Sequence, residues 1–346
     1  MKVEKSELTV LLNALHDTGT ERVKVKHPCD EVGELVEFEL GDADKSTVRF
    51  TKQEDDYEEA RESVSIEHGE TAYNDLPEPS EYARIFVGSD VLDLGNQKDV
   101  EMFLEEEGRA NINHGHEPRF VGFDTNLYPW RVDTSLNMNP DSSDTDKPPL
   151  VNGFALAEGV RREMNWDHKH GSGNVRELVE AFGDEFKRMT NQPGGAQRQG
   201  RLGVVQHSAL KSHSYGEEIS SEKGDEAIVG AYKRYNDETG KRPLLLSNDR
   251  EFVERAHHNS LLAARVKFDD ELPRKTTASW DEIERSLYFM AVIFGVVVLP
   301  KMTVYGVWTG KREDEWSRGV LDVEFRSPKV EDTAERYFEV LEAYER

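Results

Sequence analysis

Two short apolar segments that each end on an aspartate constrain the fold of this chain most. They are Phe120-Val-Gly-Phe-Asp124 and Leu244-Leu-Leu-Ser-Asn-Asp249. Each is expected to form a strand that delivers a carboxylate at its carboxyl end. Ligands of open α/β sheets bind in the crevice beyond these strand ends. The two aspartates therefore predict one shared acidic pocket.

The region from residue 120 to residue 268 alternates apolar strands with segments of helix length, which predicts a parallel sheet with covering helices. A helix is expected to start near Asn152 and to carry Glu158 and Glu163. Residues five apart lie about 140° apart around a helix, so only one of the two glutamates can face the pocket. Glu163 is preferred because it lies beside Met164, which with Val160 forms a face suited to packing on the sheet.

A third acidic position, Asp225, begins another expected helix, which leads into the strand that ends at Asp249. Capping of free N–H groups alone would explain an aspartate there. However, one helix followed by one strand brings the helix N-terminus and the strand C-terminus to the same edge of the sheet. Asp225 is therefore expected to join the acidic pocket.

Together these segments resemble the PIN-domain family of metal-dependent nucleases over residues 118–270. The resemblance rests on Asp124-Thr-Asn126, on Glu163 before Met164, on Gly224-Asp225, and on Ser247-Asn-Asp249 followed by Phe252. The sequence pattern does not locate the second strand of the family. The resemblance implies an α/β fold of three layers around a central parallel sheet.

The resemblance also implies the chemistry. Asp124, Glu163, Asp225 and Asp249 would be the catalytic carboxylates and the ligands of Mg²⁺ or Mn²⁺, cations that prefer oxygen ligands. Asn126 and Ser247 would support the site by hydrogen bonds. The implied reaction is hydrolysis of phosphodiester bonds, in RNA rather than DNA, by a protein that forms a homodimer. The alternative is an inactive PIN-like module that binds nucleic acid or serves as a protein scaffold.

Three consecutive parts are expected: an N-terminal accessory α+β domain (residues 1–115), the PIN-like nuclease domain (116–270), and a C-terminal α/β extension (271–346). The first part has a helix with Leu8, Leu11, Leu12 and Leu15 at helical spacing, and strands at residues 35–40 and 46–50. The stretch 53–81 is rich in Glu, Asp, Ser and Pro, which suits a solvated connection or a salt-adapted face; a solvated loop is preferred over an interaction tail.

An uninterrupted apolar run, residues 287–299, marks the C-terminal part. It is shorter than the about 20 residues that cross a bilayer, so it predicts a buried helix that continues into a strand rather than a membrane span. Strands near residues 304–308 and 319–325 and a helix over residues 330–344 should follow. This extension should pack on the nuclease-like core or form a dimer interface.

The net charge is −25, from 69 acidic and 44 basic residues. Such an excess disfavours nucleic-acid binding, which needs basic contacts to phosphate, unless the acidity is an adaptation to concentrated salt. Because the excess is spread over the whole chain, we expect a halophilic protein.

Cys29 is the single cysteine, which excludes an intramolecular disulfide and a cysteine-rich metal site. The N-terminus lacks the apolar core of a signal peptide, so a cytoplasmic protein is expected.

Overall fold

The chain forms two compact units. In this computed structural model the described residues are 1–42, 45–108, 110, 114–138, 140, 150–164, 172–195, 197–212, 215–269, 271–307 and 317–345. The first unit contains Met1–Val91, Trp166–Arg198 and Asp270–Arg346, and the second contains Leu92–Asn165 and Gln199–Asp269. This division differs from the three consecutive domains expected from the sequence, because the N-terminal and C-terminal segments belong to one unit.

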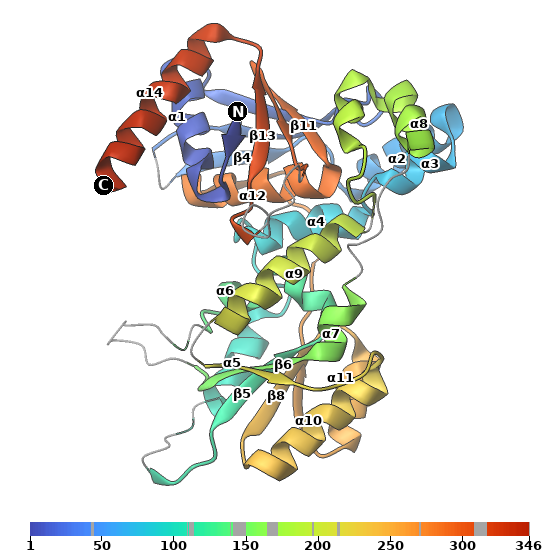
Figure 1. The fold of residues 1–346 in the computed structure, drawn as a ribbon, viewed down its shortest axis with the longest axis vertical. Helices are drawn as coiled ribbons and strands as arrows, with labels where there is room; N and C mark the ends of the chain where they lie inside the picture. Colours follow the sequence, from blue (N-terminus) through green and yellow to red (C-terminus); the bar gives the residue numbers. More distant parts are fainter. Residues whose placement is uncertain are drawn as a thin grey trace. The chain divides into compact units, whose positions relative to one another are not determined.

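An eight-stranded antiparallel sheet organises the first unit, in the order β1-β13-β12-β11-β2-β3-β4-β10 (Figure 1). The strands are β1 (Lys2–Val3), β2 (Arg22–Lys26), β3 (Glu34–Glu39), β4 (Ser46–Phe50), β10 (Lys275–Ala278), β11 (Val296–Leu299), β12 (Met302–Tyr305) and β13 (Leu321–Phe325). The predicted strands near residues 35–40 and 46–50 are confirmed, as is the C-terminal strand pair. The C-terminal segment completes the N-terminal sheet, which differs from the expected extension of the central domain.

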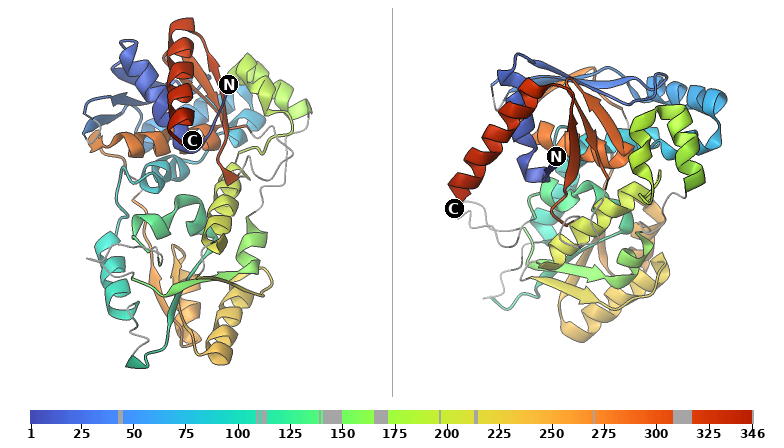
Figure 2. Two further views of the ribbon diagram at one scale, coloured as in Figure 1. Left: turned by 60° about the vertical axis from the view of Figure 1, so that its left-hand side comes forward. Right: turned by 45° about the horizontal axis from the view of Figure 1, so that its top comes forward.

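The helices of the first unit are α1 (Leu8–Asp17), α2 (Glu54–His68), α3 (Glu70–Asp75), α4 (Pro79–Gly88), α8 (Ser172–Phe182), α12 (Trp280–Phe294) and α14 (Pro328–Glu345), with 3₁₀ turns η1 (Lys5–Glu7) and η4 (Asp184–Met189). Helices α1 and α14 lie side by side in both views of Figure 2. The predicted N-terminal helix is confirmed as α1. The predicted apolar helix is confirmed as α12, which is capped by Ser279 and followed by β11.

The expectation of a solvated loop over residues 53–81 is wrong, because this stretch forms α2, α3 and the start of α4. Its few apolar residues lie at helical spacing: Tyr57, Ala60 and Val64 are all buried on α2. A narrow apolar stripe is enough to hold a helix against a core even when most of the remaining positions are acidic or otherwise polar. The high acidic content therefore describes the outer face of the helix and not a loop.

Within the described residues, no helix is both long enough and apolar enough to cross a membrane. Helix α12, which contains most of the apolar run, has Ser286 fully buried, and the Ser286 hydroxyl lies 2.8 Å from the Ser89 hydroxyl. The apolar run is therefore part of the core of the first unit.

A five-stranded parallel sheet organises the second unit, in the order β7-β6-β5-β8-β9. The strands are β5 (Arg119–Phe123), β6 (Gly153–Ala157), β7 (Gly216–Ile219), β8 (Arg242–Ser247) and β9 (Leu262–Arg265). The helices are α5 (Gln97–Glu107), α6 (Val132–Ser135), α7 (Glu158–Glu163), most of α9 (Gln197–Ser212), α10 (Asp225–Thr239) and α11 (Arg250–His258), with the 3₁₀ turn η3 (Thr125–Trp130). The predicted α/β alternation with a parallel sheet is confirmed.

One element of this unit was predicted wrongly. Residues 153–157 form strand β6, whereas a helix was expected from Asn152 onwards. All five residues are buried, and the strand lies between β5 and β7. A short apolar run buried on both faces cannot be told from a helix segment by periodicity alone. The helix that follows, α7, covers only residues 158–163.

A close approach between β5 and α10 fixes the position of the α10 N-terminus. A Cβ atom at Gly122 would lie 2.5 Å from the Tyr232 ring, so only glycine admits this ring. The Tyr232 hydroxyl donates a hydrogen bond of 2.9 Å to the Ala155 carbonyl, which ties α10 to β6 as well. Helix α10 is thereby held on the sheet, with Asp225 at its first position.

Candidate functional site

The strand order of the parallel sheet reverses between β5 and β8. The chain proceeds from β5 to β6 and β7 on one side, then returns to β8 and β9 on the other. Asp124 follows β5 directly and Ser247 ends β8, so both lie at the carboxyl edge of this reversal point. The Asp124 N–H donates to the Leu246 carbonyl at 2.9 Å. This is the crevice where open α/β sheets bind their ligands.

Asp124 is a buried carboxylate, with 4% of its surface exposed. It accepts hydrogen bonds from the Ser247 hydroxyl (2.6 Å), the Thr125 N–H (2.7 Å) and the Asn126 side-chain amide (3.4 Å). Burial, with a smaller contribution from the charges of Asp225 and Glu163, nevertheless raises its pKa to about 6, against the lowering effect of the Ser247 and Thr125 bonds. A carboxylate in this environment gains from a nearby cation.

Ser247 connects the ends of the two central strands. Its hydroxyl donates to Asp124 and accepts the Asp249 N–H at 2.9 Å. Asp249 is the N-cap of α11, and its carboxylate accepts the Glu251 N–H at 2.7 Å. One hydroxyl therefore links the Asp124 carboxylate to the backbone of Asp249.

Glu163 ends α7 and is held by two donors. Its carboxylate accepts hydrogen bonds from the Thr125 hydroxyl and from the Gly224 N–H, the latter at 2.7 Å. Glu158 instead pairs with Arg162 at 3.2 Å. Of the two glutamates considered from the sequence, the structure brings Glu163 to the residue that follows Asp124.

Asp225 is the first residue of α10, and Gly224 is the N-cap. The capping role considered for Asp225 is therefore not the one it has. Burial raises the pKa of Asp225, the charges of Asp249 and Glu163 raise it further, and the Arg255 guanidinium lowers it. These mutual repulsions show that the four acidic side chains gather in one region of the second unit.

The four carboxylates supply oxygen donors, the kind that Mg²⁺ and Mn²⁺ prefer. Within the described residues, no three of them bring ligand atoms within 4.8 Å of one another. Mg²⁺ usually keeps several waters and is held by one or two carboxylates. The donor set thus fits a hydrated divalent cation better than a closed cage of protein ligands.

Thr125 is a site residue that the sequence analysis did not single out. It donates its N–H to Asp124 and its hydroxyl to Glu163, so it joins two of the carboxylates. Its position between Asp124 and Asn126 is the only signal in the sequence. The role depends on the position of α7, which follows β6, the strand that the sequence pattern did not locate.

In comparisons with known proteins, no family model, no curated protein and no solved structure matches this chain. The PIN-domain family therefore stays a resemblance carried by the residues named above.

Proposed function

We propose that this protein is a divalent-metal-dependent nuclease, a hydrolase that cleaves phosphodiester bonds in RNA rather than DNA. The observation that carries the proposal is the buried Asp124 at the reversal point of the parallel sheet, with Asp249, Asp225 and Glu163 around it. The preference for RNA, the three-layer PIN-like fold of the second unit and a homodimer follow from the family resemblance. We also propose a cytoplasmic, salt-adapted protein, from the dispersed charge of −25.

Asp124 and Asp249 are the proposed principal metal ligands, followed by Asp225 and then Glu163. When bound, Mg²⁺ or Mn²⁺ would act as a Lewis acid that lowers the pKa of a water molecule and offsets charge on the phosphodiester. The chain prepares this site in advance, because Ser247 and Asn126 orient the Asp124 carboxylate and Thr125 orients Glu163. Preorganised ligands do not have to be rearranged during the reaction.

One cation of the protein lies among these carboxylates. The Arg255 charge acts on Asp225, and the buried Arg255 Nε has no hydrogen-bond partner within the described residues. A guanidinium suits the recognition of a phosphate group. Arg255 would therefore hold a substrate phosphate beside the metal ligands, in a chain whose net charge otherwise repels nucleic acid.

The second candidate is a module of this fold that binds nucleic acid or protein without cleavage. It is favoured by one observation: among the described residues, no three of the carboxylates have ligand atoms within 4.8 Å of one another. The two candidates share the same surface and differ in whether a cation is held tightly enough for hydrolysis.

A cleavage assay separates the candidates. Labelled RNA and labelled single-stranded DNA are incubated with Mn²⁺ in high salt, with wild type, Asp124→Asn and Asp237→Asn. Asp237 is exposed on α10, 12 residues from Asp225 and about 18 Å along the helix. Wild type and Asp237→Asn should cleave RNA, and Asp124→Asn should be slower by about 10³-fold.

Equal cleavage by wild type and Asp124→Asn would contradict the nuclease proposal. RNA binding without cleavage by wild type would favour the non-catalytic module. Cleavage of DNA alone would overturn the proposed substrate and leave the reaction in place.

A further inference from the structure

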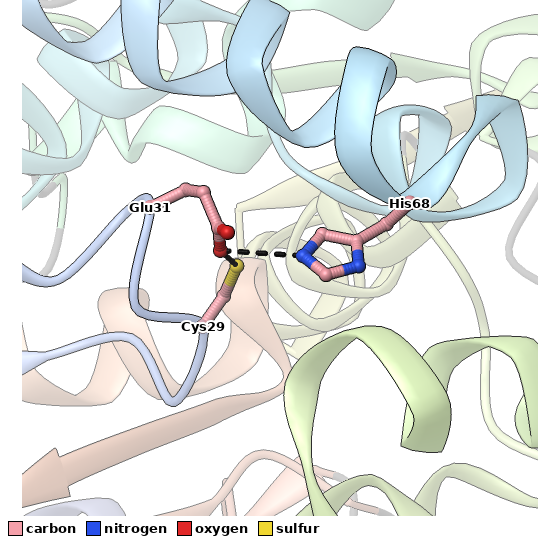
Figure 3. Close-up of side chains that lie close together, drawn as sticks. All are labelled: Cys29, Glu31 and His68. Atoms are coloured by element: carbon pink, nitrogen blue, oxygen red, sulfur yellow. Dashed lines mark hydrogen bonds and ion pairs between the residues drawn. The ribbon is translucent and has the colours of Figure 1, made fainter.

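A second group of metal-ligating side chains lies in the first unit, far in the sequence from the carboxylates described above. It consists of Cys29, Glu31 and His68 (Figure 3). The Cys29 thiol donates to Glu31 Oε2 at 2.8 Å, and His68 Nε2 lies 3.3 Å from the same oxygen. The sulfur, oxygen and nitrogen atoms all lie within 4.8 Å of one another. Three different donor types thus converge on one point.

The turn between β2 and β3 holds two of these donors in place. The His27 N–H donates to the Gly33 carbonyl at 2.9 Å, and the Gly33 N–H donates to the Cys29 carbonyl at 2.8 Å. Gly33 has a φ of +59°, a conformation that favours glycine. The Cys29 N–H donates to His27 Nδ1 at 3.2 Å. A closed turn of this kind presents Cys29 and Glu31 without further ordering.

His68 comes from a separate segment, as the last residue of α2. The end of a helix is fixed by the packing of the helix, and α2 is anchored by Tyr57 and Val64 in the core. The cluster therefore joins the β2–β3 turn to the end of α2. A ligand bound here would tie together two parts of the first unit that are 39 residues apart, from Cys29 to His68.

Two of the three separations between ligand atoms are close to those of a tetrahedral zinc site, and the third, between Cys29 and His68, is at most 4.8 Å. With Zn–N and Zn–O distances of about 2.1 Å, two such ligands lie about 3.4 Å apart, and a thiolate sulfur lies about 3.6 Å from an oxygen ligand. The observed 3.3 Å between His68 and Glu31 already agrees. The observed 2.8 Å between Cys29 and Glu31 has to widen by less than one ångström.

We propose that Cys29, Glu31 and His68 form a Zn²⁺ site. Thiolate and imidazole ligands select zinc over magnesium or calcium, which prefer oxygen alone. Three protein ligands leave one coordination position for water. Glu31 and His68 also line a cavity of about 690 Å³, which gives water access to that position. This site is independent of the proposed nuclease in its residues, its unit and its choice of metal.

Without a cation the three side chains form a hydrogen-bonded group. Burial, followed by the bond to Glu31, raises the pKa of the Cys29 thiol to about 12. Zinc binds the thiolate, so the thiol proton passes to the solvent when the metal enters. A binding experiment has to detect the sulfur–metal bond itself. A measurement of total bound metal would also count cations held by the acidic surface.

Cobalt provides that readout. Co²⁺ is titrated into the whole protein, and the thiolate-to-cobalt charge-transfer absorption in the near ultraviolet is measured. Because Cys29 is the only cysteine, this absorption reports one site alone. We expect the absorption to saturate at an amplitude of one thiolate–cobalt bond per chain, to disappear when Zn²⁺ is added, and to be absent with Cys29→Ser. Cobalt that binds wild type without this absorption would overturn the proposal.

Two further variants keep the test decisive if Cys29→Ser does not fold, as judged by circular dichroism. His68 has a side chain 25% exposed, so His68→Gln should fold, and it should bind Co²⁺ at least about tenfold more weakly. Glu62→Gln, on the exposed face of the same helix, should bind as wild type does. Equal affinity of His68→Gln and wild type would also overturn the proposal.

Discussion

Each of the two units buries an aspartate, and the two aspartates are treated differently. In the first unit, Asp75 and Arg198 have side chains 1% and 3% exposed and form two hydrogen bonds of 2.8 and 2.7 Å. In the second unit, Asp124 is held by Ser247, Thr125 and Asn126, none of which carries a charge. The fold itself neutralises Asp75, whereas Asp124 has its pKa raised. Asp75 is thus neutralised within the fold, whereas the raised pKa of Asp124 accords with the functional role proposed for it.

The largest effect is expected when the buried ion pair of Asp75 and Arg198 is broken. Arg198→Met should lower the free energy of unfolding by about 3–5 kcal/mol, because it leaves the Asp75 charge buried without its cation. Denaturant unfolding at neutral pH measures this. Arg250→Met is the matched control, since the Arg250 side chain is 76% exposed and pairs with Glu254 on the surface. A control loss as large as that of Arg198→Met would remove the distinction between the two ion pairs.

Asp124→Asn tests the uncompensated carboxylate through its pH dependence. The folded-state pKa is raised from 3.8 to about 6, so the folded protein binds the proton more tightly than the unfolded chain does. Its contribution to stability is then fully present below pH 4 and is lost as the pH rises to 6. Asp124→Asn has no carboxyl group to ionise at this position, so it does not lose stability in this way as the pH rises. Its free energy of unfolding relative to wild type should rise by about 2 kcal/mol between pH 4 and pH 6. A difference that stays flat over this range would contradict the raised pKa.

A divalent cation bound at the carboxylates of the second unit should stabilise the protein. The size of this stabilisation should depend on Asp225. At 100 times its dissociation constant, Mn²⁺ adds about 2.7 kcal/mol to wild type by mass action. A tenfold loss of affinity in Asp225→Asn would reduce this by about 1.4 kcal/mol. Thermal unfolding over a Mn²⁺ titration measures the effect, with Asp237→Asn as the control that should follow wild type. Identical titrations for wild type, Asp225→Asn and Asp237→Asn would show that Asp225 does not bind the cation.

The smallest effect is expected from Ser247→Ala. The variant loses the bond to Asp124 and leaves the Asp249 N–H without its acceptor, which should lower the free energy of unfolding by about 1 kcal/mol. It should also raise the pKa of Asp124 further, since the Ser247 bond lowers it in wild type. Denaturant unfolding and carboxyl titration by NMR measure both. Ser63→Ala, which removes an exposed hydroxyl on α2, should be nearly neutral.

Sequence reasoning located the parts of the fold that local patterns determine. Strand β8 and the start of α10 follow from an apolar run and from Gly224-Asp225, and α1 follows from leucines at helical spacing. It failed where burial overrides pattern, as in β6, whose five residues fit a helix or a buried strand equally well. It also failed at α2, where acidity concealed a narrow apolar stripe.

The same limit of sequence reasoning applies to the two candidate sites. Asp124 and Asp249 could be inferred because strand ends meet at one edge of a parallel sheet. The group of Cys29, Glu31 and His68 could not, because nothing in the sequence relates a turn to a helix end 39 residues away. A single cysteine was taken to exclude a cysteine-rich metal site, and that argument does not exclude a mixed site with one thiol.

The eight-stranded sheet also determines the order in which the protein can fold during synthesis. Strand β2 pairs with β11, β4 pairs with β10, and Lys2 of β1 lies opposite Asp322 of β13. At about 5–20 residues per second, the ribosome needs roughly 10–40 s to make residues 92–269 before these partners emerge. Until then β2 and β4 are open sheet edges, which attract other chains. The parallel sheet begins later in the chain, yet all its strands are available first.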